Sequence, residues 1–164
     1  MLFRYRPFDV EDIELKWQER WRQSGLYQVD NDDPRERFYA LCMYPYPSGV
    51  AHQGHVRNYT FGDLVTRYQT MRGRAVLSPF GFDSFGLPAE NAAIKAGSHP
   101  RIFTDQRIGE LRESVQRLGA VYDWRREVQS HDPEYIKYSQ TIFLKRLEEH
   151  TSELQSPMYL VCRL

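Results

Sequence analysis

The most informative segment of the sequence is Met43-Tyr44-Pro45-Tyr46-Pro47-Ser48-Gly49-Val50-Ala51-His52-Gln53-Gly54-His55-Val56-Arg57-Asn58-Tyr59-Thr60. It begins as an apolar and aromatic strand pattern, passes through a Pro/Ser/Gly turn, and continues as a helix that opens on His-x-Gly-His. A helix start leaves its first N–H groups unpaired and carries the positive end of the peptide dipole, so it binds anions and above all phosphates. His52 and His55 share one face of the first turn and add N–H donors, while Gly54 leaves room for a flat ring against the backbone. These features predict a site for a nucleoside triphosphate.

Two other interpretations of the histidine pair have to be weighed. A bare His-x-x-His is most often a pair of surface histidines with no ligand. A zinc site is disfavoured, because the familiar zinc helices place two histidines four apart with a glutamate between them, whereas His52 and His55 are three apart without one. We therefore expect no metal ligands here.

The composition fits a single domain. The chain has 164 residues, and its 22 Lys and Arg balance its 22 Asp and Glu, so no basic field indicates a nucleic acid partner. Cys42 and Cys162 do not make a disulfide framework or a metal cluster. No apolar run reaches membrane-spanning length, and the first residues lack the apolar core of a signal peptide. We therefore expect a cytoplasmic protein with no membrane partner.

The order of elements predicts an α/β fold with a parallel sheet. Periodicity, caps and turn residues predict helices over residues 9–25, 54–71, 88–96, 104–118 and 132–147. Short apolar runs predict buried strands over residues 38–44 and 75–79. Strands that alternate with helices pair in parallel, and ligands bind at the carboxyl ends of such strands. Because the turns at residues 45–55 and 80–90 each follow a strand, we expect them to meet at the same edge of the sheet.

A second motif lies in the later turn: Gly81-Phe82-Asp83-Ser84-Phe85-Gly86-Leu87-Pro88-Ala89-Glu90-Asn91-Ala92-Ala93. Taken alone, it is a glycine-bounded turn in which Asp83 would stabilise the turn itself. Together the two motifs resemble the signatures of class I aminoacyl-tRNA synthetases, and their flanks resemble the leucyl-tRNA synthetases in particular. The likeness continues in order through residues 95–100, 117–119, 122–128 and 132–135.

The resemblance implies a fold and an activity. Residues 1–147 are expected to be the amino-terminal part of the catalytic domain, the first half of the Rossmann-like nucleotide-binding fold of class I synthetases. Members of this family join leucine to ATP, which acts with Mg²⁺ as a substrate, and then pass the leucine to its tRNA. The resemblance implies no bound cofactor in this segment, a tRNA that contacts domains outside it, and a monomeric parent enzyme.

The resemblance also implies ATP-binding residues. His52 and His55 match the motif histidines, which hold the ATP phosphates and stabilise the charge that builds at the α-phosphate, so they are the expected catalytic pair. Gly54 matches the glycine beneath the adenine. Asn58 and Thr60 lie further along the same helix and are expected as additional ATP contacts.

The expected leucine site combines the two motifs. Asp83 matches the acid that pairs with the leucine ammonium, since a carboxylate that faces a cation orients a free amino acid. The other expected contacts are Met43, Tyr44 and Tyr46. Two departures from the family pattern are Gln53, which replaces an apolar residue, and Phe82, which replaces a tryptophan. We expect little effect from either.

The second signature of the family, a Lys-Met-Ser-Lys-Ser loop that grips pyrophosphate, does not occur in the sequence. We therefore expect this chain to be a fragment that is inactive alone. Two alternatives are a stand-alone nucleotidyltransferase of the same superfamily, which would need its own phosphate-gripping loop, and a non-catalytic paralogue, which would have damaged site residues.

Residues 148–164 do not resemble the family. They resemble the translation of a synthetic sequencing-library adapter, because the adapter string GAAGAGCACACGTCTGAACTCCAGTCA encodes Glu-Glu-His-Thr-Ser-Glu-Leu-Gln-Ser, the order of residues 148–156. We therefore expect a non-native tail that takes no part in the fold.

Overall fold

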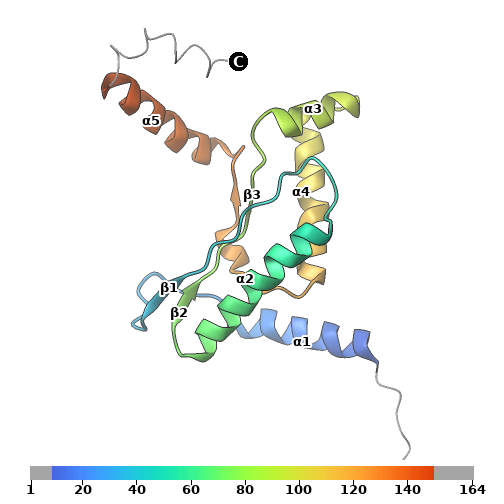
Figure 1. The fold of residues 1–164 in the computed structure, drawn as a ribbon, viewed down its shortest axis with the longest axis vertical. Helices are drawn as coiled ribbons and strands as arrows, with labels where there is room; N and C mark the ends of the chain where they lie inside the picture. Colours follow the sequence, from blue (N-terminus) through green and yellow to red (C-terminus); the bar gives the residue numbers. More distant parts are fainter. Residues whose placement is uncertain (1–8, 150–164) are drawn as a thin grey trace, which may run out of the picture.

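The computed structural model describes residues 9–149, drawn in colour in Figure 1. The α-helices are α1 (Val10–Ser24), α2 (Gln53–Met71), α3 (Leu87–Lys95), α4 (Pro100–Arg117) and α5 (Pro133–Glu149), and a 3-10 helix, η1, covers Trp124–Arg126. The strands are β1 (Arg37–Tyr39), β2 (Ala75–Leu77), β3 (Gly81–Phe82) and β4 (Val128–Gln129). The expected tail lies outside the described residues, apart from the last two residues of α5.

The strands pair in parallel along one extended segment, residues 75–82. β1 pairs with β2, and β3 pairs with β4. The Val128 N–H donates to the Phe80 carbonyl oxygen at 3.0 Å, and the Ser130 N–H donates to the Phe82 carbonyl oxygen at 3.1 Å. The predicted α/β fold with parallel strands is therefore confirmed.

The strands are shorter than the sequence predicts. The strands predicted over residues 38–44 and 75–79 end early, since β1 and β2 have three residues each. After β2 the extended chain changes partner, because the Asp123 N–H donates to the Ser78 carbonyl oxygen at 2.9 Å. Pro79 has no N–H with which to extend the first ladder.

Local capping sets the ends of the helices. As predicted, α1 begins after Asp9, whose side chain caps it, and ends at Gly25 with φ of 61°. α4 begins at Pro100 rather than at residue 104. The His99 side chain accepts the Arg101 N–H, and a proline fits the first turn because its missing N–H would have had no helical partner.

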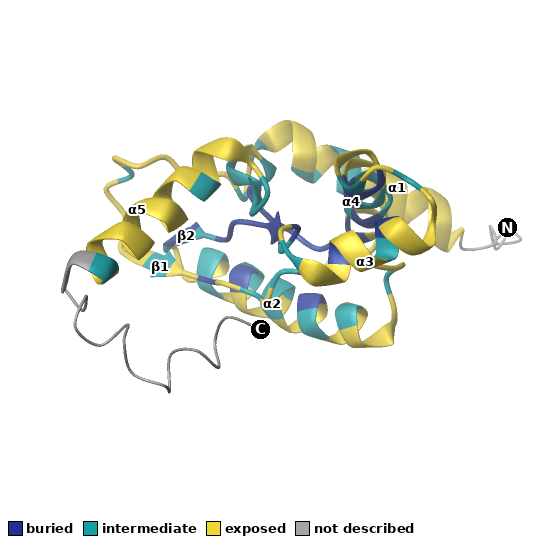
Figure 2. Ribbon diagram, turned by 90° about the horizontal axis from the view of Figure 1, so that it is seen from above, coloured by how far each residue is buried: buried dark blue, intermediate teal, exposed yellow. Residues whose placement is uncertain are grey.

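The hydrophobic core lies between the extended segment, α2 and α4. Its buried residues are Tyr59, Phe80, Phe82, Ile108, Leu111, Val115, Ala120 and Tyr122. Figure 2 shows the buried strand segment at the centre, while α5 is almost entirely exposed. Between residues 9 and 149, no helix combines the length and the apolar character needed to cross a membrane.

Candidate active site at the start of helix α2

The two motif histidines form the cap of α2. His52 is the N-cap residue, and its Nδ1 accepts the Gly54 N–H at 3.1 Å. In return, Nδ1 of His55 accepts the His52 N–H at 3.2 Å, which completes a reciprocal capping box. The two rings stack with centroids 4.0 Å apart. The structure therefore places both histidines on one face of the first turn.

This capping arrangement determines where the imidazole protons lie. Since both Nδ1 atoms accept hydrogen bonds, each neutral ring carries its proton on Nε2, and that N–H is available to a ligand. Burial lowers the pKa of His55, and the neighbouring His52 lowers it further, so His55 is neutral at pH 7. The site therefore presents the Nε2–H of neutral His55 as a donor beside the helix start.

The core fixes the position of the pair. The ring of His55 stacks on Tyr59 at 5.9 Å with an interplanar angle of 8°, and Tyr59 is 2% exposed. A Cβ on Gly54 would lie 2.8 Å from Cε1 of His52, closer than packed carbon atoms approach. A side chain at residue 54 would therefore displace the His52 ring from its capping position.

The loop before α2 alternates between buried and exposed side chains. Pro45 and Pro47 are buried, whereas Met43 and Tyr46 are 80% and 55% exposed. Tyr44 lies half-buried against the backbone of β3, where a Cβ on residue 81 would meet its ring at 2.6 Å. Met43 and Tyr46 are thus free to contact a ligand, while Tyr44 also packs the loop onto the sheet.

The two further ATP candidates on α2 differ in their surroundings. The Asn58 side chain donates to the Met43 carbonyl oxygen at 3.3 Å and so ties α2 to the loop. Thr60 is exposed and, at 100° per residue, lies about 140° around the helix from His55. The structure therefore brings Asn58 to the site and leaves Thr60 on another face.

The second motif meets the first at Asp83. Its backbone N–H donates to the Pro45 carbonyl oxygen at 3.0 Å, as expected for turns that follow neighbouring parallel strands. Its carboxylate Oδ1 accepts the Ser130 hydroxyl at 3.3 Å. Ser130 and its neighbour His131, which contacts the Ser84 hydroxyl at 2.7 Å, were not predicted from the sequence. The strand before them has only two residues, too few for a periodic pattern.

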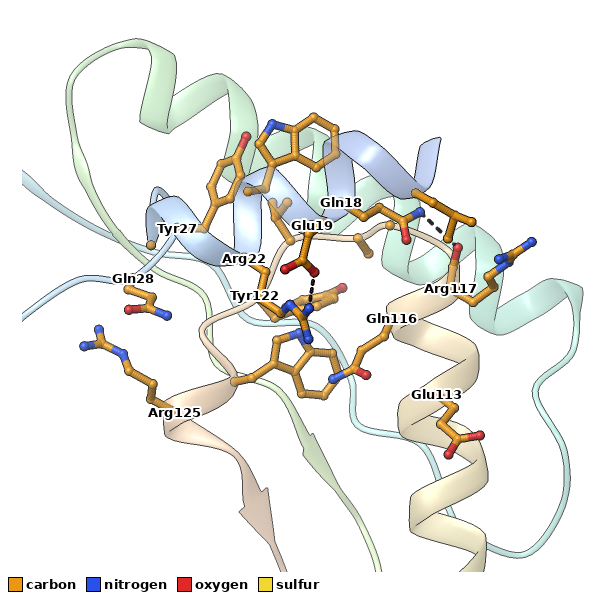
Figure 3. A pocket seen from close by; sticks show the side chains of 17 residues that line it. Gln18, Glu19, Arg22, Tyr27, Gln28, Glu113, Gln116, Arg117, Tyr122 and Arg125 are labelled. Carbon is orange, nitrogen blue, oxygen red and sulfur yellow. Dashed lines mark hydrogen bonds and ion pairs between the residues drawn. The ribbon is translucent and has the colours of Figure 1, made fainter. Parts of the chain in front are cut away.

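A cavity of about 470 Å³ lies elsewhere, between α1, the end of α4 and η1 (Figure 3). Several of its charged and polar groups already bind one another: Arg22 pairs with Glu19, and the Gln18 side chain donates to the Arg117 carbonyl oxygen at 3.3 Å. Because these groups are engaged within the protein, we assign the cavity no ligand.

Comparison with known proteins identifies the family. The family model described as tRNA synthetases class I (I, L, M and V) matches residues 16–152. The chain belongs to this family. Its Rossmann-like α/β fold is accordingly that of class I synthetases.

Curated relatives of this synthetase chain are leucine–tRNA ligases. The enzyme of Thermosynechococcus vestitus is 51% identical over 141 residues, which is 86% of this chain and 16% of the relative. Leucine–tRNA ligase subunit alpha of Aquifex aeolicus is 51% identical over 143 residues, which is 87% of this chain and 22% of the relative. The resemblance to leucyl-tRNA synthetases is therefore confirmed, and the chain spans only a small part of these proteins.

Solved structures agree with this assignment. The ternary complex of Agrobacterium radiobacter K84 agnB2 LeuRS with tRNA and LeuAMS matches with a TM-score of 0.82 and 42% identity, over 87% of this chain and 18% of that one. Mycobacterium tuberculosis methionyl-tRNA synthetase in complex with methionyl-adenylate matches with a TM-score of 0.57 and 22% identity, over 60% and 19%. This second match supports the class I fold alone.

Proposed function

We propose that this chain forms part of the amino acid activation site of a leucine–tRNA ligase. The enzyme joins leucine to ATP as leucyl-adenylate and passes the leucine to its tRNA. The observation that carries the proposal is the hydrogen bond between Asp83 and Pro45, which joins the ammonium-binding candidate to the loop that leads into the histidine cap. The identity to leucine–tRNA ligases supports the choice of amino acid.

The ATP half of the site is the start of α2. The Nε2–H groups of His52 and His55 would donate to the triphosphate, and the helix dipole favours its negative charge. Gly54 would lie beneath the adenine, with Asn58 as an outer contact. Thr60 lies on another face of α2 and is left out of the proposed site. Mg²⁺ enters the proposal as the partner of the ATP phosphates, which bind it directly.

The leucine half lies between the two motifs. The Asp83 carboxylate would pair with the ammonium group, and Met43, Tyr44 and Tyr46 would line the pocket for the side chain. These contacts would leave the leucine carboxylate free to face the α-phosphate.

Positioning and charge stabilisation account for the proposed chemistry. A carboxylate oxygen of leucine attacks the α-phosphorus, the bond from that phosphorus to the bridging oxygen breaks, and pyrophosphate leaves. The Nε2–H groups of His52 and His55 would donate hydrogen bonds to the charge that builds on the phosphate oxygens. No proton has to be abstracted from the leucine carboxylate, since it is already ionised at pH 7.

The proposal also includes the location, the oligomeric state and the tRNA contacts that we expect from the sequence. We place the enzyme in the cytoplasm as a monomer, with the tRNA bound mainly by parts that these residues do not include. We further propose that residues 1–147 belong to the catalytic domain and that residues 148–164 are a non-native tail. Amplification of the gene from genomic DNA without adapters tests the tail: a different sequence after codon 147 supports the proposal, and the same seventeen codons contradict it.

Leucine-dependent exchange of pyrophosphate into ATP tests the proposed function. Residues 9–147 replace the matching segment of the Thermosynechococcus vestitus enzyme, which yields a complete ligase, and exchange is measured with leucine, isoleucine, methionine and valine. We expect half-maximal exchange at a lower concentration of leucine than of isoleucine, methionine or valine. Exchange that prefers another of these amino acids would contradict the assignment. A folded chimera that binds ATP and catalyses no exchange would favour a non-catalytic paralogue.

A further inference from the structure

Ser130 is bound to the loop that carries Asp83 through both its hydroxyl and its backbone N–H. Its hydroxyl accepts the Ser84 N–H at 2.7 Å and the Phe85 N–H at 3.0 Å. Its backbone N–H donates to the Phe82 carbonyl oxygen at 3.1 Å. The hydroxyl also lies 3.3 Å from Oδ1 of Asp83. Ser130 therefore contacts four consecutive residues of the turn, 82–85.

The number of bonds fixes the direction of the contact with Asp83. A serine hydroxyl has one proton to donate and two lone pairs that accept. The two backbone N–H groups occupy both lone pairs, so the proton of Ser130 is left to donate, and Oδ1 of Asp83 accepts it. This bond restrains the rotation of the Asp83 carboxylate, and it engages Oδ1 rather than Oδ2.

We propose that Ser130 is a positioning residue for leucine: it orients the Asp83 carboxylate toward the ammonium group. The inference rests on the proposed function, because it assumes that Asp83 binds this ammonium. Ser130 never touches the substrate in this account. It acts through the orientation of one carboxylate oxygen.

Hydrogen bonds on both sides of Ser130 hold its backbone in place. It directly follows β4, whose Val128 N–H is bound to the central segment at 3.0 Å. The next residue, His131, bridges the Ser84 hydroxyl at 2.7 Å and Oδ1 of Asp105 on α4 at 3.1 Å. The end of β4 is thus fixed to both the turn and α4, so a hydroxyl at residue 130 has a defined place.

Kinetics in the complete chimeric ligase test the proposal, with Ser130→Ala as the variant and Ser114→Ala as the matched control. Ser114 is exposed on α4, and its hydroxyl binds only its own helix, at 2.9 Å from the Glu110 carbonyl oxygen. We expect Ser130→Ala to raise KM for leucine about tenfold, as the loss of a hydrogen bond to a charged group does. KM for ATP should change by less than about twofold, and Ser114→Ala should change neither.

A leucine analogue without the amino group separates positioning from mere support of the fold. The inhibition constant of 4-methylpentanoate should stay the same in Ser130→Ala, since this compound has no ammonium for Asp83 to bind. If KM for leucine and the inhibition constant of 4-methylpentanoate rose by the same factor, or if KM for leucine did not rise, the proposal would be overturned. If Ser130→Ala does not fold, the isosteric pair Ser130→Thr and Ser130→Val decides, because only threonine keeps the hydroxyl and should keep the leucine KM.

Asp83→Asn distinguishes failure of this inference from failure of the proposed function. If Asp83→Asn leaves KM for leucine unchanged, the proposed leucine site is wrong and the role of Ser130 falls with it. If Asp83→Asn raises KM while Ser130→Ala does not, only the inference about Ser130 is wrong.

Discussion

The backbone N–H of Asp83 donates a hydrogen bond to the carbonyl oxygen of Pro45, at 3.0 Å. This bond joins two motifs that lie in separate turns of the chain. Both turns follow strand segments of one parallel fold, so their ends meet at one edge. The bond thereby ties the turn that carries Asp83 to the loop that leads into α2, as the proposed site for an amino acid and ATP requires.

The capping and ligand roles of His52 can be separated by substitution. His52→Asn keeps a side chain that caps helices well, whereas His52→Ala does not, so only alanine should lower the free energy of unfolding, by about 1 kcal/mol. Both variants lose the Nε2–H donor, and both should lower kcat for exchange in the chimera by about 10²-fold. Urea unfolding and exchange kinetics measure the two effects. Full activity in His52→Asn would show that the ring does not contact ATP.

The pH dependence of stability should reveal the environment of His55. Burial and the neighbouring His52 lower its pKa below the usual 6.5, so the unfolded chain binds this proton more readily than the folded chain. The contribution of His55 to stability is therefore complete above pH 6.5 and declines as the pH falls toward its folded pKa. Protonation also removes the Nδ1 acceptor of the capping box. An NMR titration of the ring gives the pKa directly, and a value above 6.5 would contradict this account.

Two glycines in helices should respond in opposite ways to alanine. On Gly54 the new Cβ would lie 2.8 Å from the His52 ring, so Gly54→Ala should displace the cap and reduce exchange. Around Gly109 in α4 a Cβ would meet nothing within 4 Å. Gly109→Ala should therefore stabilise the protein by about 0.5–1 kcal/mol, since alanine favours the helix. Thermal unfolding compares the two variants, and equal stabilisation would argue against a tight contact at His52.

We expect Asp123 to contribute strongly to the free energy of unfolding and to take no part in catalysis. It is 0% exposed and accepts hydrogen bonds from the Arg125 side chain at 3.0 Å and from the Val29 N–H at 3.4 Å. Burial raises the pKa of Asp123, but these hydrogen bonds outweigh it and hold the pKa below its usual value. Asp123→Ala should cost about 2–3 kcal/mol, because the buried Val29 N–H loses its acceptor and a gap is left in place of the carboxylate.

The matched control for Asp123→Ala is Asp30→Ala. Asp30 also pairs with Arg125, at 3.3 Å, but its side chain is 76% exposed. Surface ion pairs contribute less than about 1 kcal/mol, so this variant should unfold at nearly the same urea concentration as the unmodified chain. Similar losses in the two variants would mean that burial of Asp123 does not matter.

Local signals in the sequence predicted the helices. Contacts between residues far apart in the chain could not be predicted in this way. α1 and α2 follow from caps at Asp9 and His52 and from their apolar periodicity, all within a few residues. β3 and β4 have two residues each, and their pairing is decided by the tertiary fold. The bond from Ser130 to Asp83 spans 47 residues and has no local signature. The motif residues could therefore be predicted from the sequence, whereas the hydrogen bond from Ser130 that holds Asp83 could not.

Binding of a non-hydrolysable leucyl-adenylate analogue, leucyl-sulfamoyl-adenosine, tests the central claim that the two motifs form one site. Calorimetry on the chimera compares the analogue, ATP and leucine in the unmodified protein, His52→Asn and Asp83→Asn. We predict that both variants bind the analogue with an affinity lower by about tenfold or more. Only His52→Asn should lower the affinity for ATP, and only Asp83→Asn should lower the affinity for leucine. An analogue that binds with unchanged affinity when either residue is replaced would contradict the account.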